Sequence, residues 1–106
     1  RLKQRADFLR AASKGRKAAV HGLVLQALPR GDDAPARVGF TVTKKIGNAV
    51  VRNRMKRRFR ELARAQLPLA GIPGADHVLI GRAGGIERDF SALSDELARA
   101  LRKAAR

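Results

Sequence analysis

Residues 44–61 read KKIGNAVVRNRMKRRFRE, a run of basic residues interrupted at regular intervals by apolar ones. At ~100° of rotation per residue, the apolar residues of a helix formed here would share one narrow stripe: Val51, Met55, Phe59 and Leu62. The bases occupy the remaining faces. The pattern predicts a helix that packs on the core through this stripe. Asn48 is expected to cap the helix, and Pro68 should end it at about Gln66.

This basic helix carries almost no acidic residues. Residues 44–64 hold nine bases, and Glu61 is the only acid among them. A solvated helix normally mixes acids with bases so that they pair along its surface. The excess of positive charge therefore predicts a polyanionic ligand, whose condensed counterions are released on binding. Arg52 and Arg54 lie ~200° apart around the helix axis, so several phosphate strands should surround it, which favours folded RNA over duplex DNA.

The residue types on the basic helix also favour RNA. Arginine outnumbers lysine in this helix, and arginine makes bidentate contacts with phosphate and stacks on bases. Asn53 can donate and accept hydrogen bonds, so it can reach a ribose hydroxyl or a base edge. The amides at Gly47 and Asn48 form either a phosphate site or a plain helix cap.

The chain as a whole is small, basic and free of cysteine. Its 106 residues predict a single domain spanning residues 1–106, and a hydrophobic content of 44% supports a folded core. Of the formal net charge of +15, residues 1–17 contribute +6 and residues 44–64 contribute +8, so the charge is concentrated in two segments. The lack of cysteine excludes disulfides and thiolate metal sites and suits a reducing compartment. No membrane-spanning run and no signal-peptide core is apparent, so a cytoplasmic protein is expected.

Two further helices are predicted, one near each end of the chain. Asp7 can cap a short first helix that ends at Gly15, and Asp89 can cap the last helix. The last helix repeats apolar residues at helical spacing, and its expected buried stripe consists of Phe90, Leu93, Leu97, Ala100 and Leu101. Asp95 and Glu96 should lie on its solvated face.

Strands are expected at residues 20–28, 37–43 and 76–82. The first two should pair antiparallel, with a polar face that includes Gly39 and Thr41 and stays open to a ligand. The third strand is apolar on both faces and should lie in the centre of the sheet. The element order is then α-β-β-α-β-α, with room for one more short strand. It predicts an α+β fold built as a small α/β sandwich.

Residues that would indicate an enzyme active site or a metal site are scarce. His21 and His77 are far apart in the sequence and fall in strand patterns, where histidine is usually structural. Asp32 and Asp33 occupy a turn beside glycine, where carboxylates serve local hydrogen bonding. No catalytic residue and no metal site are therefore expected in this chain. Phe8 is either a core residue or a stacking platform for an unpaired nucleotide.

The basic stretch also resembles a known signature. Its pattern, KKxGxAVxRNRxKRxxRE from Lys44 to Glu61, is similar to that of the protein subunit of bacterial ribonuclease P. The resemblance extends over nearly the whole chain: it includes Arg1-Leu2, Asp7-Phe8, VGFTV at residues 38–42 and DHVLIGR at residues 76–82.

This resemblance implies both a fold and a function. The fold would be ribosomal-protein-like, with a left-handed β-α-β crossover through the basic helix, although crossovers are generally right-handed. The chain would be a non-catalytic subunit that assists ribonuclease P RNA in removing the 5′ leader of precursor tRNA, in a complex of one protein with one RNA. Hydrolysis would use metal-activated water on the RNA, with Mg²⁺ as the expected ion.

The resemblance also implies residue roles. One set would line a cleft for the single-stranded leader: Phe8, Val24, Thr41, Lys44, Arg52, Asn53 and Arg60. A second set would face the catalytic RNA: Asn48, Arg54, Lys56, Arg57 and Arg58. Two aromatic positions of the family correspond here to Ala12 and Gln26, so leader binding should depend more on phosphate contacts.

Two other classes remain open from the residues alone. A ribosomal or general RNA-binding protein would share the basic helix but would not depend on a 5′ leader. A basic DNA-binding protein would read duplex DNA with one face of the helix. A membrane-surface helix is disfavoured, because the apolar stripe is too narrow and is needed by the core.

Overall fold

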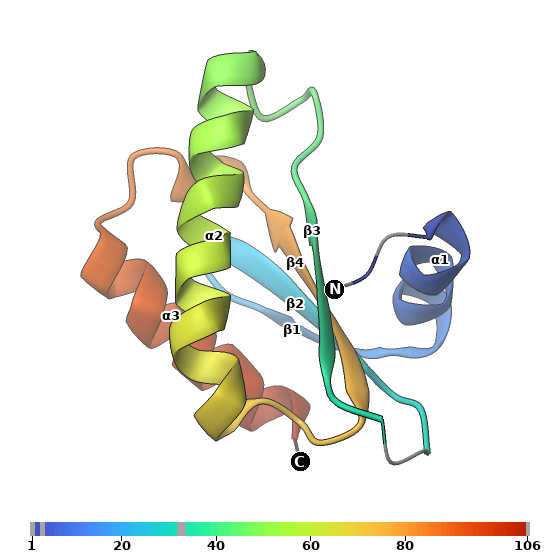
Figure 1. Ribbon diagram of the computed structural model, residues 1–106. Coiled ribbons are helices and arrows are strands. Elements are labelled where there is room, and N and C mark those ends of the chain that lie inside the picture. Colours follow the sequence, from blue (N-terminus) through green and yellow to red (C-terminus); the bar gives the residue numbers. More distant parts are fainter. Residues whose placement is uncertain (1, 3, 32–33, 106) are drawn as a thin grey trace.

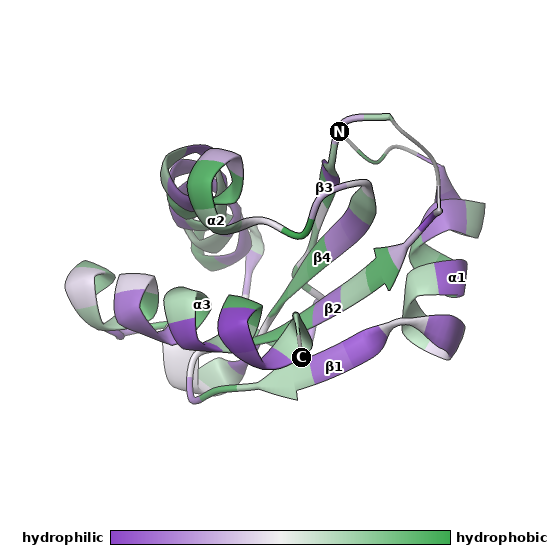
Figure 2. Ribbon diagram, turned by 90° about the horizontal axis from the view of Figure 1, so that it is seen from below, coloured by the Kyte–Doolittle hydropathy of each residue, from purple (hydrophilic) through white to green (hydrophobic). Residues whose placement is uncertain are grey.

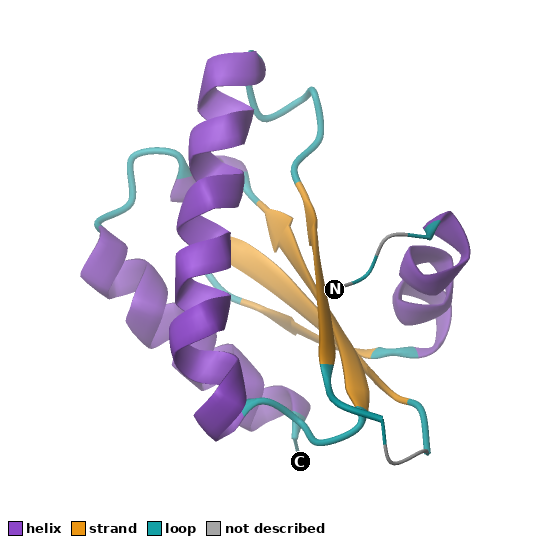
Figure 3. Ribbon diagram, viewed as in Figure 1, coloured by secondary structure: helices purple, strands orange, loops and turns teal. Residues whose placement is uncertain are grey.

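The computed structural model describes residues 2, 4–31 and 34–105. They form these elements: α1 (Arg5–Lys14), β1 (Arg16–Ala19), β2 (Leu23–Pro29), β3 (Arg37–Thr41), α2 (Ala49–Ala70), β4 (Ala75–Gly81), the 3-10 helix η1 (Ala83–Gly85) and α3 (Phe90–Ala104). The strands make one sheet in the order β1-β2-β4-β3. Helices α2 and α3 cover one face of this sheet, and α1 packs on the other (Figures 1 and 3). The predicted α+β sandwich is confirmed.

Strand β4 lies in the centre of the sheet, as predicted. It pairs antiparallel with β2 and parallel with β3, so the antiparallel pair expected between the first two predicted strands is wrong. Most of β4 is buried, and a strand that is apolar on both faces takes an inner position because both faces need cover. In Figure 1, α2 lies to the left of the sheet and β3 is its nearest strand, with β4 behind it, as the view from below in Figure 2 also shows. Seen from the α2 side with β3 running upward, β4 therefore lies to the left of β3. The β3-α2-β4 crossover is therefore left-handed, as the resemblance implied.

The first predicted strand is in fact two strands, β1 and β2, which pair antiparallel as a hairpin. The Val20 amide donates to the Leu23 carbonyl at 2.9 Å and closes the turn. A Cβ at Gly22 would lie only 2.5 Å from Leu93 on α3, so glycine permits this close approach. The order becomes α-β-β-β-α-β-α. His21 consequently lies in an exposed bend instead of a strand.

The main core fills the space between the sheet and the two longer helices. Three residues of the predicted α2 stripe are buried, with Met55, Phe59 and Leu62 each no more than 3% exposed, whereas Val51 is half-buried. The sheet and α3 supply the other large side chains: Leu23, Leu25, Leu79, Leu93, Leu97 and Leu101. A smaller cluster lies under α1, where Leu2, Ala11 and Val78 pack with Phe8, Leu28 and Ile80.

The ends of α1 and α2 differ partly from the predictions. Helix α1 begins at Arg5, so Asp7 is not its cap but lies in its first turn. Asn48 caps α2 as predicted, because its Oδ1 accepts a hydrogen bond from the Val51 amide at 3.0 Å.

Helix α2 also continues through Pro68 to Ala70 instead of ending near Gln66. A proline this close to the C-terminus removes only one helical hydrogen bond. In addition, the Gln66 side chain donates to the Ser94 carbonyl on α3 at 2.9 Å, which anchors the last turns.

Two expectations for α3 are wrong. Phe90 is 40% exposed and lies outside the buried stripe. Glu96 is buried at 1% exposure, whereas Asp95 is exposed as expected. The Glu96 carboxylate accepts hydrogen bonds from the Gly22 amide at 2.9 Å and from Arg88 Nε at 2.8 Å. These partners offset the cost of burying a charge, and they hold the β1-β2 turn against α3.

Candidate RNA-binding surface

Helix α2 turns its apolar stripe inward and leaves its polar side chains on the surface. The exposed polar residues on its outer faces include Asn53, Arg54, Arg57, Arg60 and Arg64. Three more bases are half-buried: Arg52, Lys56 and Arg58. The helix therefore presents positive charge in several directions, as the sequence predicted for a polyanion-binding helix.

Phe8 on α1 packs directly against strand β3. A Cβ at Gly39 would lie 2.6 Å from both Cε1 and Cζ of the Phe8 ring, so glycine is needed for this contact. The strand register places Val24, Ile80 and Thr41 in one row across β2, β4 and β3, and this row is half-exposed. Phe8 is half-buried itself. It thus belongs to the small core under α1 and also borders an open strip of the sheet.

A groove of about 460 Å³ connects α1 with α2 across the edge of the sheet. We call it the α1–α2 groove; it is lined by Arg5, Phe8, Leu9, Phe40, Thr41, Val42 and Lys56. Successive strand residues point to opposite faces, so a groove that touches residues 40, 41 and 42 must pass around the edge of β3. Strand β3 is indeed at the edge of the sheet. The groove therefore joins the two basic segments, which are far apart in the sequence.

The other residues assigned to the leader cleft are not among those that line this groove. Val24 lies in the half-exposed row of the sheet, and Lys44 is exposed on the loop between β3 and α2. Asn53 is exposed on α2, and Arg60 lines a neighbouring groove with Phe40. The structure thus brings Phe8 and Thr41 together with Lys56, which the resemblance had assigned to the catalytic RNA.

Arg52 has an unusual environment. Its Nε atom is shielded from solvent and has no hydrogen-bond partner among the described residues, while the residue as a whole is half-exposed. A buried donor without a partner is costly and uncommon.

Arg58 is engaged within the fold. Its guanidinium donates to the Arg88 carbonyl and lies 5.8 Å from the centroid of the Phe90 ring. This cation–π contact partly covers the exposed Phe90. Arg58 therefore links α2 to the start of α3, a structural role that the sequence pattern did not reveal.

The two aromatic positions that differ from the family also have distinct environments. Ala12 is exposed on α1, one helical turn after Phe8. Gln26 is 7% exposed and is paired in register with Val78 under α1. Phe8 is therefore the aromatic side chain that α1 contributes to the groove.

An ion-pair cluster, which the sequence did not suggest, fixes α1 on the sheet. Arg37 on β3 donates from Nε and Nη2 to both carboxylate oxygens of Asp76 on β4, at 2.8 Å each. The same guanidinium lies 3.6 Å from Asp7 on α1. Burial raises the pKa of Asp76, but its contacts with Arg37 and Arg30 outweigh this and hold the pKa below its ordinary value of 3.8.

His77 has a structural role, as predicted. Its Nε2 accepts a hydrogen bond from the Ile72 amide at 3.0 Å, and its Nδ1 lies 3.2 Å from the Arg37 carbonyl. This arrangement suits a neutral ring, and burial lowers the pKa of His77 below its ordinary value of 6.5.

Within the described ranges, no group of three or more His, Asp or Glu residues is placed to hold a metal ion. Asp32 and Asp33, considered above as a turn, lie outside the described residues. In the same part of the chain, no helix combines the length and apolar character needed to cross a membrane.

Comparisons with known proteins agree with the fold and the basic signature. A family profile described as Ribonuclease P matches residues 1–105. The ribonuclease P protein component of Gluconacetobacter diazotrophicus is 60% identical over 104 residues, which cover 98% of this chain and 90% of that protein. That of Erythrobacter litoralis is 59% identical over 103 residues, covering 97% of this chain and 84% of that protein.

Solved structures give the same result. The RNase P protein of Staphylococcus aureus superposes with a TM-score of 0.84 at 30% identity, covering 97% of this chain and 93% of that one. The RNase P protein of Thermotoga maritima gives a TM-score of 0.81 at 29% identity, covering 99% of this chain and 94% of that one. Because the profile, the relatives and the structures agree over almost its whole length, the chain belongs to the ribonuclease P protein component family.

Proposed function

We propose that this chain binds ribonuclease P RNA through the outer faces of α2 and holds the 5′ leader of precursor tRNA in the α1–α2 groove. The observation that carries the proposal is the lining of that groove by Phe8, Thr41 and Lys56, from three different elements. An aromatic ring, a hydroxyl and a positively charged amine along one path suit an unpaired nucleotide strand. Such a strand offers flat nucleobases, ribose hydroxyls and phosphates to these three groups.

Leader binding would combine one stacking contact with several phosphate contacts. Phe8 supplies the stacking surface, and the absence of aromatic residues at Ala12 and Gln26 leaves fewer such surfaces than in the family pattern. Lys56 lines the groove, and the half-exposed Arg52 one turn earlier on α2 would be a second phosphate contact. Electrostatic contacts of this kind bind phosphate with little dependence on sequence. The leader should therefore be held with weak base preference.

The catalytic RNA would contact the faces of α2 that point away from the groove. Arg54 and Arg57 are exposed and free to approach phosphate strands on those faces. The Asn48 side chain is already used to cap α2, so its contribution would come through the exposed start of the helix, whose amides favour anions. Arg58 is half-buried beside Phe90, so only the exposed part of its guanidinium would contact the RNA.

In this proposal the chain is a non-catalytic subunit. Hydrolysis of the phosphodiester would take place on the RNA subunit, and Mg²⁺ held there would supply metal-activated water. The protein neutralises RNA phosphates and positions the leader, and one protein binds one ribonuclease P RNA. The compartment would be the cytoplasm.

Reconstitution tests the proposal. The full chain is combined with a bacterial ribonuclease P RNA at low Mg²⁺ concentration, and cleavage of precursor tRNA and affinity for precursor and mature tRNA are measured. The proposal predicts cleavage at the 5′ end of the tRNA and tighter binding of the precursor. Binding without leader dependence would instead indicate a general RNA-binding protein, and preference for competing duplex DNA would indicate a DNA-binding protein.

A further inference from the structure

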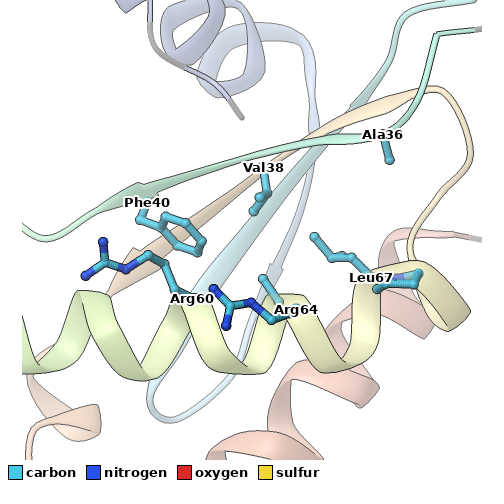
Figure 4. A pocket seen from close by; sticks show the side chains of 8 residues that line it. Ala36, Val38, Phe40, Arg60, Arg64 and Leu67 are labelled. Carbon is cyan, nitrogen blue, oxygen red and sulfur yellow. The ribbon is translucent and has the colours of Figure 1, made fainter.

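A second groove lies next to the first one, between β3 and α2. This β3–α2 groove has a volume of about 390 Å³ and is lined by Ala36, Val38, Phe40, Arg60, Ala63, Arg64, Leu67 and Pro68. Figure 4 shows Ala36, Val38 and Phe40 on the β3 side facing α2, and Arg60, Arg64 and Leu67 on α2. None of the family-derived roles described above includes Arg64 or the apolar residues of this groove.

The chemistry of the β3–α2 groove combines an apolar floor with a basic rim. Val38, Ala63 and Leu67 line it with aliphatic side chains. Arg60 and Arg64 are exposed on the same face of α2, one helical turn apart. Neither arginine forms an ion pair or a hydrogen bond with any side chain in the described ranges. Such a combination suits a ligand with flat apolar groups and regularly spaced negative charges.

The groove adjoins the α1–α2 groove at one shared residue. Phe40 lines both of them, and both follow the edge of β3. An extended ligand that passes Phe8 and Thr41 in the first groove would next meet Phe40 and then Arg60 and Arg64 in the second. We infer that the β3–α2 groove binds the part of the leader farther from the cleavage site, as an unpaired RNA segment whose phosphates contact Arg60 and Arg64. This inference rests on the proposed function and extends its site.

Charge selects RNA over the other ligand that an edge strand suggests. An open strand edge can also pair with an added peptide strand, but the two exposed arginines on the rim, which have no ion-pair partner in the described part of the chain, and a formal net charge of +15 favour a polyanion. A base laid on the aliphatic floor would bury apolar surface, while its phosphates face the guanidiniums. Arg64 is the best residue to test, because it is exposed and lines this groove without lining the α1–α2 groove.

The experiment uses the reconstituted holoenzyme and a series of precursor tRNAs whose leaders are lengthened one nucleotide at a time. Wild-type protein is compared with Arg64→Ala and with Arg99→Ala, which removes an equal charge from an exposed position of α3. Helix α3 packs against α2 and against β1 and β2, and Arg99 lines neither groove. Arg64→Ala should bind short-leader precursors like wild type and long-leader precursors about threefold more weakly. When log affinity is plotted against log salt concentration, the slope for Arg64→Ala should be shallower than that of wild type by ~0.7. This difference should appear with the long leader only.

Three results would overturn the inference. Equal weakening at every leader length would place Arg64 against the catalytic RNA. Equal losses of affinity in Arg64→Ala and Arg99→Ala would show a general effect of charge. Unchanged affinity of Arg64→Ala at every leader length would show that the groove binds no RNA, as expected if it binds a peptide strand. A wild-type holoenzyme that fails to distinguish precursor from mature tRNA would instead refute the proposed function itself.

Discussion

The contact between Phe8 and Gly39 provides a sensitive test of the α1–α2 groove. In Gly39→Ala, the new Cβ would lie 2.6 Å from the Phe8 ring, whereas an ordinary contact begins at 3.4 Å, so the ring must retreat by about 0.8 Å. Leu2 Cβ, at 3.0 Å from the same position, limits the space on another side. The variant therefore moves the proposed stacking surface without removing any charge.

The size of the effect follows from packing and from stacking. Overpacking lowers the free energy of unfolding by ~1–3 kcal/mol. Replacing glycine by alanine raises it by ~0.4–1 kcal/mol, because alanine reduces the conformational entropy of the unfolded chain. The free energy of unfolding should thus fall by about 0.5–2 kcal/mol, measured by urea denaturation. A base stacked on an aromatic ring contributes ~1–3 kcal/mol, so partial loss should weaken precursor binding roughly threefold to tenfold and leave mature tRNA unaffected.

A double-mutant cycle with Phe8→Leu supplies the control. The shorter leucine relieves the clash, so the stability losses of Phe8→Leu and Gly39→Ala should be less than additive in the double variant. The precursor affinity of the double variant should match that of Phe8→Leu alone. Additive losses, or a Gly39→Ala protein with wild-type stability and precursor affinity, would refute the idea that the Phe8 ring lies on Gly39 and stacks a leader base.

Three further predictions follow from other contacts. Arg52→Ala should weaken the binding of precursor tRNA more than that of mature tRNA. The slope of log precursor affinity against log salt concentration should become shallower by ~0.7. Equal losses of affinity for both RNAs would contradict a position of Arg52 beside the leader. The pKa of His77 lies below 6.5 in the folded chain, so the unfolded chain binds the proton more readily, and the free energy of unfolding should fall as the pH drops below about 6.5. Urea denaturation across this pH range should show the fall in the free energy of unfolding for wild type and not for His77→Gln. An equal fall in both proteins would contradict the assignment of this pH dependence to His77. Glu96→Gln should lower the free energy of unfolding by about 1–3 kcal/mol, because Arg88 loses its buried counter-charge. At temperatures where the Glu96→Gln protein is folded, RNA affinity should stay unchanged, and a loss of affinity there would show that Glu96 also acts on the binding surface.

Features that follow from a regular spacing of apolar residues, or from local chemistry, could be predicted from the sequence. The stripe of Met55, Phe59 and Leu62 predicted both the inner face of α2 and, by exclusion, its basic outer faces. The cap at Asn48 followed from local chemistry, because an amide side chain before a helix can accept from the free amides of the first turn. The central position of β4 followed from its apolar residues on both faces. In each case the signal lies within a short stretch of the sequence, although the packing that it predicts involves distant residues.

Features that depend on distant partners were not readable. Glu96 looked like a solvated residue because its partners, Gly22 and Arg88, come from other parts of the chain. Strand β1 lacks an alternating pattern and exists because it pairs with β2. The ion pairs of Arg37 with Asp7 and Asp76, and the groove that follows the edge of β3, likewise appear only once the topology is known.

Photo-crosslinking from Thr41 most directly tests whether the leader lies in the α1–α2 groove. The chain contains no cysteine, so Thr41→Cys provides a unique thiol for a photoreactive label at a half-exposed position of the groove. Arg99→Cys on α3 serves as the matched control. In the reconstituted holoenzyme bound to precursor tRNA, label at position 41 should crosslink to leader nucleotides, and label at position 99 should not. Crosslinks from position 41 that map to the catalytic RNA, or equal leader crosslinking from both positions, would contradict the account.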